Sequence, residues 1–155
     1  PYDALDQWRA VYPAEIYISQ LEKVARGFDT ALTGLKQAAG KTSGLSRTHR
    51  RALGEECSVA EAAAIHFRSC ANQAQFVLAR QALAAAGTES ERAGHKARLR
   101  ALLEAEALLA RRLWQLQSRD SRIGFEASNQ YYYVPLDLVE KVLNCRDLLE
   151  RWLRD

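Results

Sequence analysis

The chain has 155 residues, of which 48% are hydrophobic and 26% charged, with 22 basic and 19 acidic side chains. This length suits one domain with a buried core, and the composition is typical of a globular protein. The near balance of charge argues against nucleic acid as a partner, because nucleic-acid binders usually carry a concentrated basic face. No stretch approaches the ~20 consecutive apolar residues of a membrane-spanning helix.

The sequence begins PYDALDQW, without an initiator Met and without a recognisable signal peptide. We therefore interpret residues 1–155 as a single helical domain excised from the C-terminus of a larger protein.

Pro13 suits the first position of a helix, and it opens a predicted long helix over about residues 13 to 39. Apolar residues recur there at steps of three and four, as expected for one buried stripe. The stripe consists of Tyr17, Leu21, Val24, Phe28, Ala31 and Leu35. Gly40 and the turn GKTSG end this helix.

Residues 46–53 form either a short separate helix or the beginning of a long one, with Gly54 as a possible interruption. Ser58 and Glu61 have the spacing of a capping box, which predicts a helix start there. This helix continues to about Ala86, and its predicted buried face consists of Ala60, Ala63, Phe67, Cys70, Ala74 and Val77.

Thr88 and Glu91 form a second capping-box pattern, and the helix that follows reaches about Arg119. Its apolar positions are Leu99, Leu102, Leu103, Leu109, Ala110, Leu113 and Trp114. Glu106 falls on the same line and needs a polar partner if it is buried.

Pro135 opens the last predicted helix. Its stripe consists of Leu138, Val142, Cys145, Leu149 and Trp152, widened by Val139, Leu143 and Leu153. Long helices joined by short turns favour an all-α, up-and-down four-helix bundle. A five-helix version with a separate helix near residues 46–54 is the main alternative. An α-solenoid fragment is less favoured because the sequence has no internal repeat.

Residues 120–134, DSRIGFEASNQYYYV, predict a long ordered loop between two helices, and such loops are often functional. Its candidate binding or docking residues are Arg122, Phe125, Glu126, Asn129, Tyr131, Tyr132 and Tyr133. Aromatic rings beside charged and amide groups are suited to sugars. Alternatively the loop is a structural plug, in which Arg122 pairs with Glu126 and Phe125 fills the core.

Asp120 and Glu126 are the residue types of a glycosidase acid and base, although a salt bridge of Asp120 to Arg119 or Arg122 is the ordinary alternative. Residues 66–76, HFRSCANQAQF, add His66, Asn72 and Gln73 as candidate docking residues on one helix. We expect this polar face to lie opposite the 120–134 loop, whose backbone needs partners.

No metal site or cofactor is predicted, because the three histidines have no ligand spacing and no HExxH motif is present. Cys57, Cys70 and Cys145 are interpreted as free thiols, with a Cys70–Cys145 bridge as the alternative. His66 and Cys70 are one helical turn apart, but the apolar position of Cys70 raises its pKa and disfavours a nucleophile.

Three runs resemble the C-terminal helical region of large, mostly uncharacterised, glycoside-hydrolase-like proteins of polysaccharide-degrading bacteria. They are WRAVYPAEIYISQLEKVARGF (8–28), HFRSCANQAQF (66–76) and DSRIGFEASNQYYYVPLDLVEKVLNCRDLL (120–149). The resemblance implies a catalytic barrel upstream, an accessory role for this chain, and export to the periplasm or cell surface.

The leading hypothesis is therefore a non-catalytic accessory domain that docks on the upstream catalytic domain of its own polypeptide through residues 120–134. A carbohydrate-binding module is the alternative, with loop tyrosines and Trp8 or Tyr12 stacking on sugar rings. A small enzyme using Asp120 and Glu126 is the third hypothesis.

Overall fold

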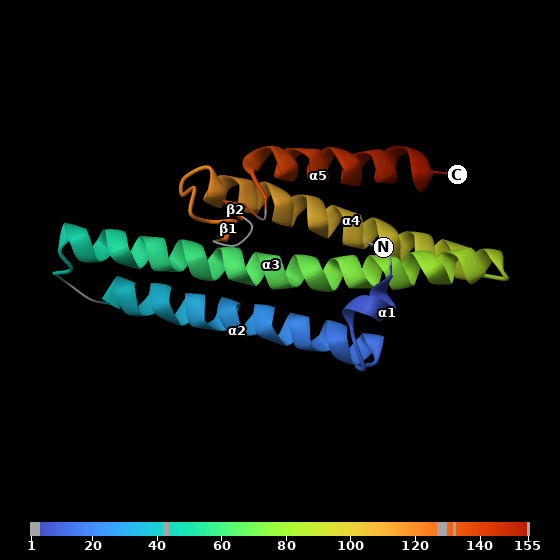
Figure 1. The fold of residues 1–155 in the computed structure, drawn as a ribbon, viewed down its shortest axis with the longest axis horizontal. Coiled ribbons are helices and arrows are strands. Elements are labelled where there is room, and N and C mark those ends of the chain that lie inside the picture. Colours follow the sequence, from blue (N-terminus) through green and yellow to red (C-terminus); the bar gives the residue numbers. More distant parts are fainter. Residues whose placement is uncertain (1–3, 42–43, 127–129, 132, 155) are drawn as a thin grey trace.

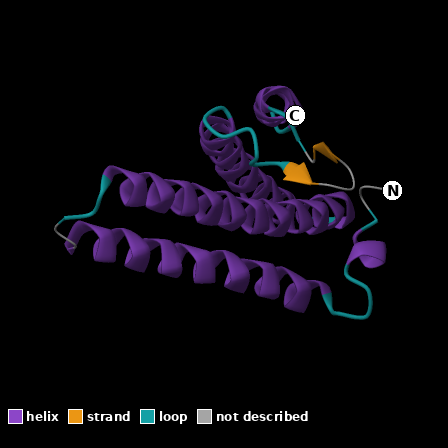
Figure 2. Ribbon diagram, turned by 60° about the vertical axis from the view of Figure 1, so that its left-hand side comes forward, coloured by secondary structure: helices purple, strands orange, loops and turns teal. Residues whose placement is uncertain are grey.

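The computed structural model describes residues 4–41, 44–126, 130–131 and 133–154. These residues form an all-α bundle in which successive long helices run antiparallel, as predicted (Figure 1). The helices are α1 (Leu5–Trp8), α2 (Ala14–Lys41), α3 (Arg47–Ala85), α4 (Glu89–Gln117), α5 (Pro135–Asp147) and a π-helical turn η1 (Leu148–Trp152). The strands β1 (Phe125–Glu126) and β2 (Gln130–Tyr131) form a two-stranded antiparallel hairpin between α4 and α5 (Figure 2).

The long helix α3 begins earlier than the capping pattern at Ser58 predicted. Ser46 caps it instead, since its side chain accepts a hydrogen bond from the backbone N–H of His49 at 3.1 Å. Ser58 lies inside the helix, where its hydroxyl donates to the carbonyl of Gly54 at 2.9 Å. A glycine inside a helix costs only about 1 kcal/mol, which tertiary packing overrides here. Residues 47–53 therefore open one long helix, which confirms that alternative, and the prediction of a separate helix near residues 46–54 is wrong.

The other predicted helix starts are confirmed. Glu91 N–H donates to the Thr88 hydroxyl at 3.3 Å, and Thr88 N–H donates back to the Glu91 carboxylate at 3.0 Å. These bonds hold the pKa of Glu91 below its ordinary value. Pro135 begins α5, and Asp137 accepts a hydrogen bond from Val134 N–H at 2.8 Å.

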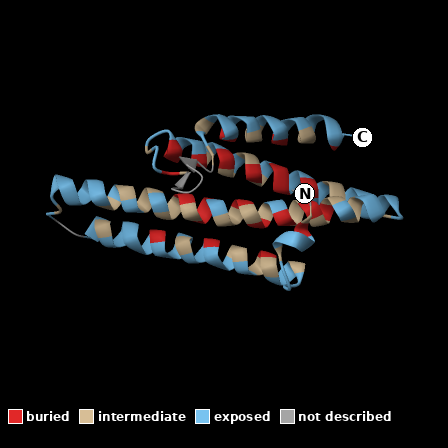
Figure 3. Cartoon of the chain, in the orientation of Figure 1, coloured by how far each residue is buried: buried red, intermediate tan, exposed pale blue. Residues whose placement is uncertain are grey.

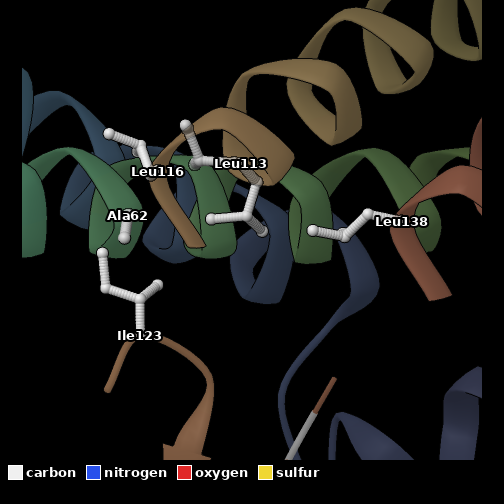
Figure 4. Packing of buried hydrophobic residues seen from close by; sticks show 6 residues of the cluster. Ala62, Leu113, Leu116, Ile123 and Leu138 are labelled. Carbon is white, nitrogen blue, oxygen red and sulfur yellow. The ribbon is translucent and has the colours of Figure 1, made fainter. Parts of the chain in front are cut away.

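Helix α3 is the centre of the fold, with α1 and α2 on one side and α4 and α5 on the other (Figure 1). The first core cluster joins α1, α2 and α3 through Leu5, Ile18, Ala71, Ala74 and Val77. The second joins α3, α4 and the C-terminal helix through Ala79, Leu99, Leu102, Leu103, Cys145 and Leu153. The third adds the segment after α4, through Ala62, Ile65, Leu113, Leu116, Ile123 and Leu138 (Figure 4).

The outer helices bury narrower stripes than the apolar pattern predicted (Figure 3). Helix α2 buries Ile18, Ala25 and Leu32, which are seven residues apart, while Val24 and Leu35 of the predicted stripe are exposed. Its main neighbour is α3, so only one line of side chains faces the core. The C-terminal helix packs mainly on α4, and its Val139, Leu143 and Trp152 likewise remain partly in solvent. Trp114 of α4 is also exposed, although α4 packs on both α3 and α5.

Candidate functional site

A groove between α3 and the segment after α4 brings together three of the predicted site residues. His66 comes from α3, whereas Arg122 and Tyr133 come from the 120–134 segment. The groove has a volume of about 300 Å³. We call it the tyrosine groove; its other lining residues are Val59, Ala62, Ala63, Phe67, Ile123 and Gly124.

The floor of the tyrosine groove is apolar and well supported. Phe67 stacks on Phe28 of α2 with ring centroids 6.1 Å apart. Ile123 is buried against Ala62 and other members of the third core cluster (Figure 4). Burying one isoleucine side chain stabilises the folded state by roughly 1.5–3 kcal/mol. Ile123 therefore anchors the segment to α3, a role that the sequence pattern did not predict.

Arg122 is held at the rim of the groove by two carboxylates. It makes a forked interaction with Asp120, with Nε to Oδ1 at 2.9 Å and a second nitrogen to Oδ2 at 2.6 Å. The same second nitrogen lies 3.3 Å from Glu55 of α3. The predicted Asp120–Arg122 salt bridge is thus confirmed. The Arg122 side chain is still 70% exposed, so it presents a positive edge to solvent.

Asp120 is poorly suited to general acid catalysis. The side chain and backbone N–H of Arg122 hold the pKa of Asp120 down, to about 2. A glycosidase acid needs the opposite shift, because it must retain its proton near neutral pH. Asp120 is therefore not the acid of the enzyme hypothesis, and the side chain of Glu126, the other carboxylate, lies outside the described structure.

Gly124 and Tyr133 close one end of the groove. Gly124 has φ +89°, and a Cβ there would lie 2.9 Å from Gln117 Nε2, from a ring carbon of Tyr133 and from the Tyr133 carbonyl. Gln117 Nε2 donates to that carbonyl at 2.5 Å. The Tyr133 ring is half-buried, and this burial raises the pKa of its hydroxyl above the ordinary value.

Several predicted residues of the loop lie outside the described structure. They are Asn129 and Tyr132, together with the side chains of Phe125, Glu126 and Tyr131. Their roles, including the proposed Arg122–Glu126 pair, stay predictions. The two other predicted aromatic anchors, Trp8 and Tyr12, are exposed, and Trp8 lines a different cavity beside Tyr17 and Cys70.

Asn72 and Gln73 belong to a second site, which we call the polar cluster. At the centre of this cluster lies Glu106 of α4, which is only 5% exposed. Its carboxylate accepts from Ser69 Oγ, from Asn72 Nδ2 at 3.1 Å, and pairs with Lys141 Nζ at 2.5 Å. Lys141 Nζ and Gln73 Nε2 each donate to Ser69 Oγ at 3.0 Å.

The polar cluster confirms that Glu106 needs a partner but corrects the predicted surroundings of the α3 polar face. Asn72 and Gln73 of that face meet Glu106 of α4 and Ser69, which Lys141 of α5 also contacts. Of the three predicted residues, only His66 borders the described part of the 120–134 segment, as predicted. The missed residue is Lys141, which lies on the apolar stripe of α5 between Leu138 and Cys145. A lysine at such a position signals a buried carboxylate opposite it, because an unpaired buried charge is costly.

His66 and Cys70 lie close together without forming a reactive pair. Cys70 Sγ is 3.8 Å from His66 Nε2. Burial raises the pKa of the Cys70 thiol, while burial and the charge of Lys141 lower the pKa of His66. Both groups are therefore neutral at pH 7, which agrees with the prediction that Cys70 is not a nucleophile. Cys57, Cys70 and Cys145 are free thiols.

The described residues contain no group of three His, Cys, Asp or Glu side chains placed to hold a metal ion. Nor does any helix within the described ranges have the length and apolar character to cross a bilayer. The fold and the two sites define the class of protein: an all-α bundle that carries the tyrosine groove and the polar cluster. Comparisons of the chain with protein-family models, with curated proteins and with solved structures gave no match.

Proposed function

We propose that the chain is a non-catalytic docking module, and that the tyrosine groove receives another domain of the same polypeptide. The observation that supports this proposal is the assembly of His66, Arg122 and Tyr133 around one apolar floor. These residues come from segments more than 50 positions apart, so only the folded bundle presents them together.

The groove has the chemical character of a protein interface. Small and aromatic residues form its floor, and exposed Arg122 forms its rim. Interfaces between proteins combine an apolar, aromatic-rich centre with a polar edge, and arginine is enriched in them. The rim also carries Val59, which is 53% exposed on α3 and adds apolar surface beside the opening.

The carboxylates of the two sites favour binding over catalysis. Asp120 is committed to Arg122, and Glu106 is committed to Ser69, Asn72 and Lys141. Both carboxylates are thus paired within the chain, and neither lines the tyrosine groove.

The partner in this proposal is the catalytic domain upstream of the chain. The resemblance of residues 66–76 and 120–149 to glycoside-hydrolase-like proteins supports that choice. A periplasmic or extracellular location is part of the same proposal and has the same basis.

Binding between this chain and the separately produced upstream domain tests the proposal. Val59→Asp places a charge at the groove rim and is expected to weaken binding at least tenfold, because a carboxylate would be desolvated at the interface. Val24→Asp is the matched control, since Val24 is 40% exposed on α2, away from the groove. Equal binding by both variants and the native chain would rule out this groove as the docking surface.

A carbohydrate-binding module remains the second candidate because of one observation. The half-buried Tyr133 ring shares the groove with His66 and Arg122, and an aromatic face with polar edges suits a sugar ring. Isothermal titration with a panel of oligosaccharides decides between the candidates. Binding that His66→Ala weakens supports the sugar site, whereas no heat from any oligosaccharide counts against it.

A further inference from the structure

A second cavity, distinct from the tyrosine groove, lies where α3, α4 and the C-terminal helix meet. Its volume is about 280 Å³. Most of its wall is apolar and consists of Phe76, Val77, Leu102, Leu103, Cys145 and Leu148. One end is polar, formed by Asn72, Gln73, Glu106 and Lys141 of the polar cluster. A cavity with one polar end on an otherwise apolar wall suits an amphiphilic small molecule.

At the polar end, the positively charged ammonium of Lys141 has one N–H donor that the described residues leave for a ligand. An ammonium group has three N–H donors, and those of Lys141 reach Glu106 at 2.5 Å and Ser69 at 3.0 Å. Within the described residues this leaves one N–H of Lys141 for a ligand. Glu106, by contrast, already accepts from three side chains. The Lys141 side chain is 33% exposed and that of Glu106 only 7%, so the ammonium is the accessible member of the pair.

We propose that this cavity binds a medium-chain carboxylate, with its head group on Lys141 and its hydrocarbon chain along the apolar wall. The size follows from packing: an apolar protein cavity of about 150 Å³ holds the six carbons of benzene. On that scale the cavity described here holds about eleven non-hydrogen atoms. Octanoate, with ten non-hydrogen atoms, fits this volume.

The head group distinguishes this proposal from non-specific apolar binding. A carboxylate gains a charge-assisted hydrogen bond from Lys141, and an alcohol gains a weaker one. An alkylammonium gains none from Lys141, which repels it, and the nearby Glu106 carboxylate already accepts from three side chains. Titration of the native chain with octanoate, octan-1-ol and octylamine, followed by amide NMR, is expected to show that order of affinity. Octylamine is expected to bind at least about tenfold more weakly than octanoate, because hydrogen bonds between charged groups are the stronger ones.

Two matched variants locate the ligand. Leu148→Phe adds ring atoms to the cavity wall and is expected to weaken octanoate binding at least tenfold. Leu149→Phe is the control, because Leu149 is also half-buried and packs on the same core cluster but does not line the cavity. Far-UV circular dichroism establishes that both variants are folded.

Octanoate binding that survives in Leu149→Phe and is lost in Leu148→Phe supports the proposal, as do shifts of the Asn72 and Gln73 side-chain amide signals. Three results would overturn it. They are absence of octanoate binding to the native chain at millimolar concentration, equal binding by the two variants, and octylamine affinity equal to that of octanoate. None of these results bears on the tyrosine groove, which lies elsewhere on α3.

Discussion

Gly124 is the residue on which the shape of the tyrosine groove depends most directly. Its φ of +89° lies in the left-handed region, where a residue with a Cβ is disfavoured by roughly 1–2 kcal/mol. An added methyl group would also lie 2.9 Å from Gln117 Nε2 and from two atoms of Tyr133. Real Cβ atoms do not approach other atoms so closely, so Gly124→Ala must displace Gln117 or Tyr133.

The expected cost of Gly124→Ala has two parts. The backbone contributes about 1–2 kcal/mol, and overpacking at a buried contact contributes about 1–3 kcal/mol. The total of roughly 2–5 kcal/mol is a large share of the roughly 5–15 kcal/mol that stabilises a typical domain. Displacement of Gln117 would also break its hydrogen bond to the Tyr133 carbonyl, so moving this side chain would not relieve the strain without a further loss of stability.

Gly44 offers a matched control for this prediction. It has φ +91°, yet a Cβ there would meet nothing within 4 Å. Gly44→Ala is therefore expected to cost only the backbone part, about 1–2 kcal/mol. Urea unfolding followed by circular dichroism measures both variants. A Gly124→Ala cost no larger than that of Gly44→Ala would refute the close packing of the groove described above.

Three further predictions concern stability. Gly54→Ala is expected to raise the free energy of unfolding by about 0.5–1 kcal/mol in a urea titration, because Gly54 is inside α3 with open space around it. Lys141→Ala is expected to lower it by about 1–3 kcal/mol, because buried Glu106 loses its cation, whereas Lys23→Ala on exposed α2 is expected to have little effect. The pKa of Asp120 is about 2 in the folded chain and 3.8 ordinarily, so its stabilisation is present above pH about 4 and is lost toward pH 2. The difference in unfolding free energy between the native chain and Asp120→Asn should therefore be larger at pH 5 than at pH 2.

Local sequence signals predicted the helices where the structure uses local interactions. The Thr88–Glu91 capping box and Pro135 mark real helix starts, because the bonds that they make join neighbouring residues. Ser58 and Glu61 have the same capping spacing, but Glu61 forms a salt bridge with Arg112 of α4 at 2.5 Å instead. A pair 51 residues apart cannot be predicted from local spacing, and the capping role that spacing predicted for Glu61 is wrong. The start at Ser46 matches the alternative in which residues 46–53 open the long helix.

The sequence predicts part of the candidate site, because a charged residue at an apolar helix position must have a polar partner. A carboxylate on the apolar line of α4 indicates a buried partner, and Glu106 has one. The identity of that partner depends on how α4 and α5 are aligned along their lengths. This alignment is set by the joint packing of Leu113 with Leu138 and Leu103 with Cys145, not by either helix alone. Sequence patterns therefore assigned Asn72 and Gln73 to the wrong neighbour.

The two sites on α3 are close enough for the charge of one to reach the other. His66 lines the tyrosine groove, and its pKa is lowered first by burial and then by the charge of Lys141 in the polar cluster. A carboxylate bound to Lys141 would offset part of that charge and so raise the pKa of His66. Octan-1-ol would occupy the same apolar wall without a charge and leave the pKa nearly unchanged. An NMR titration of the His66 ring with each molecule measures this effect, and an equal pKa in octanoate and octan-1-ol would show that the two sites are electrostatically independent.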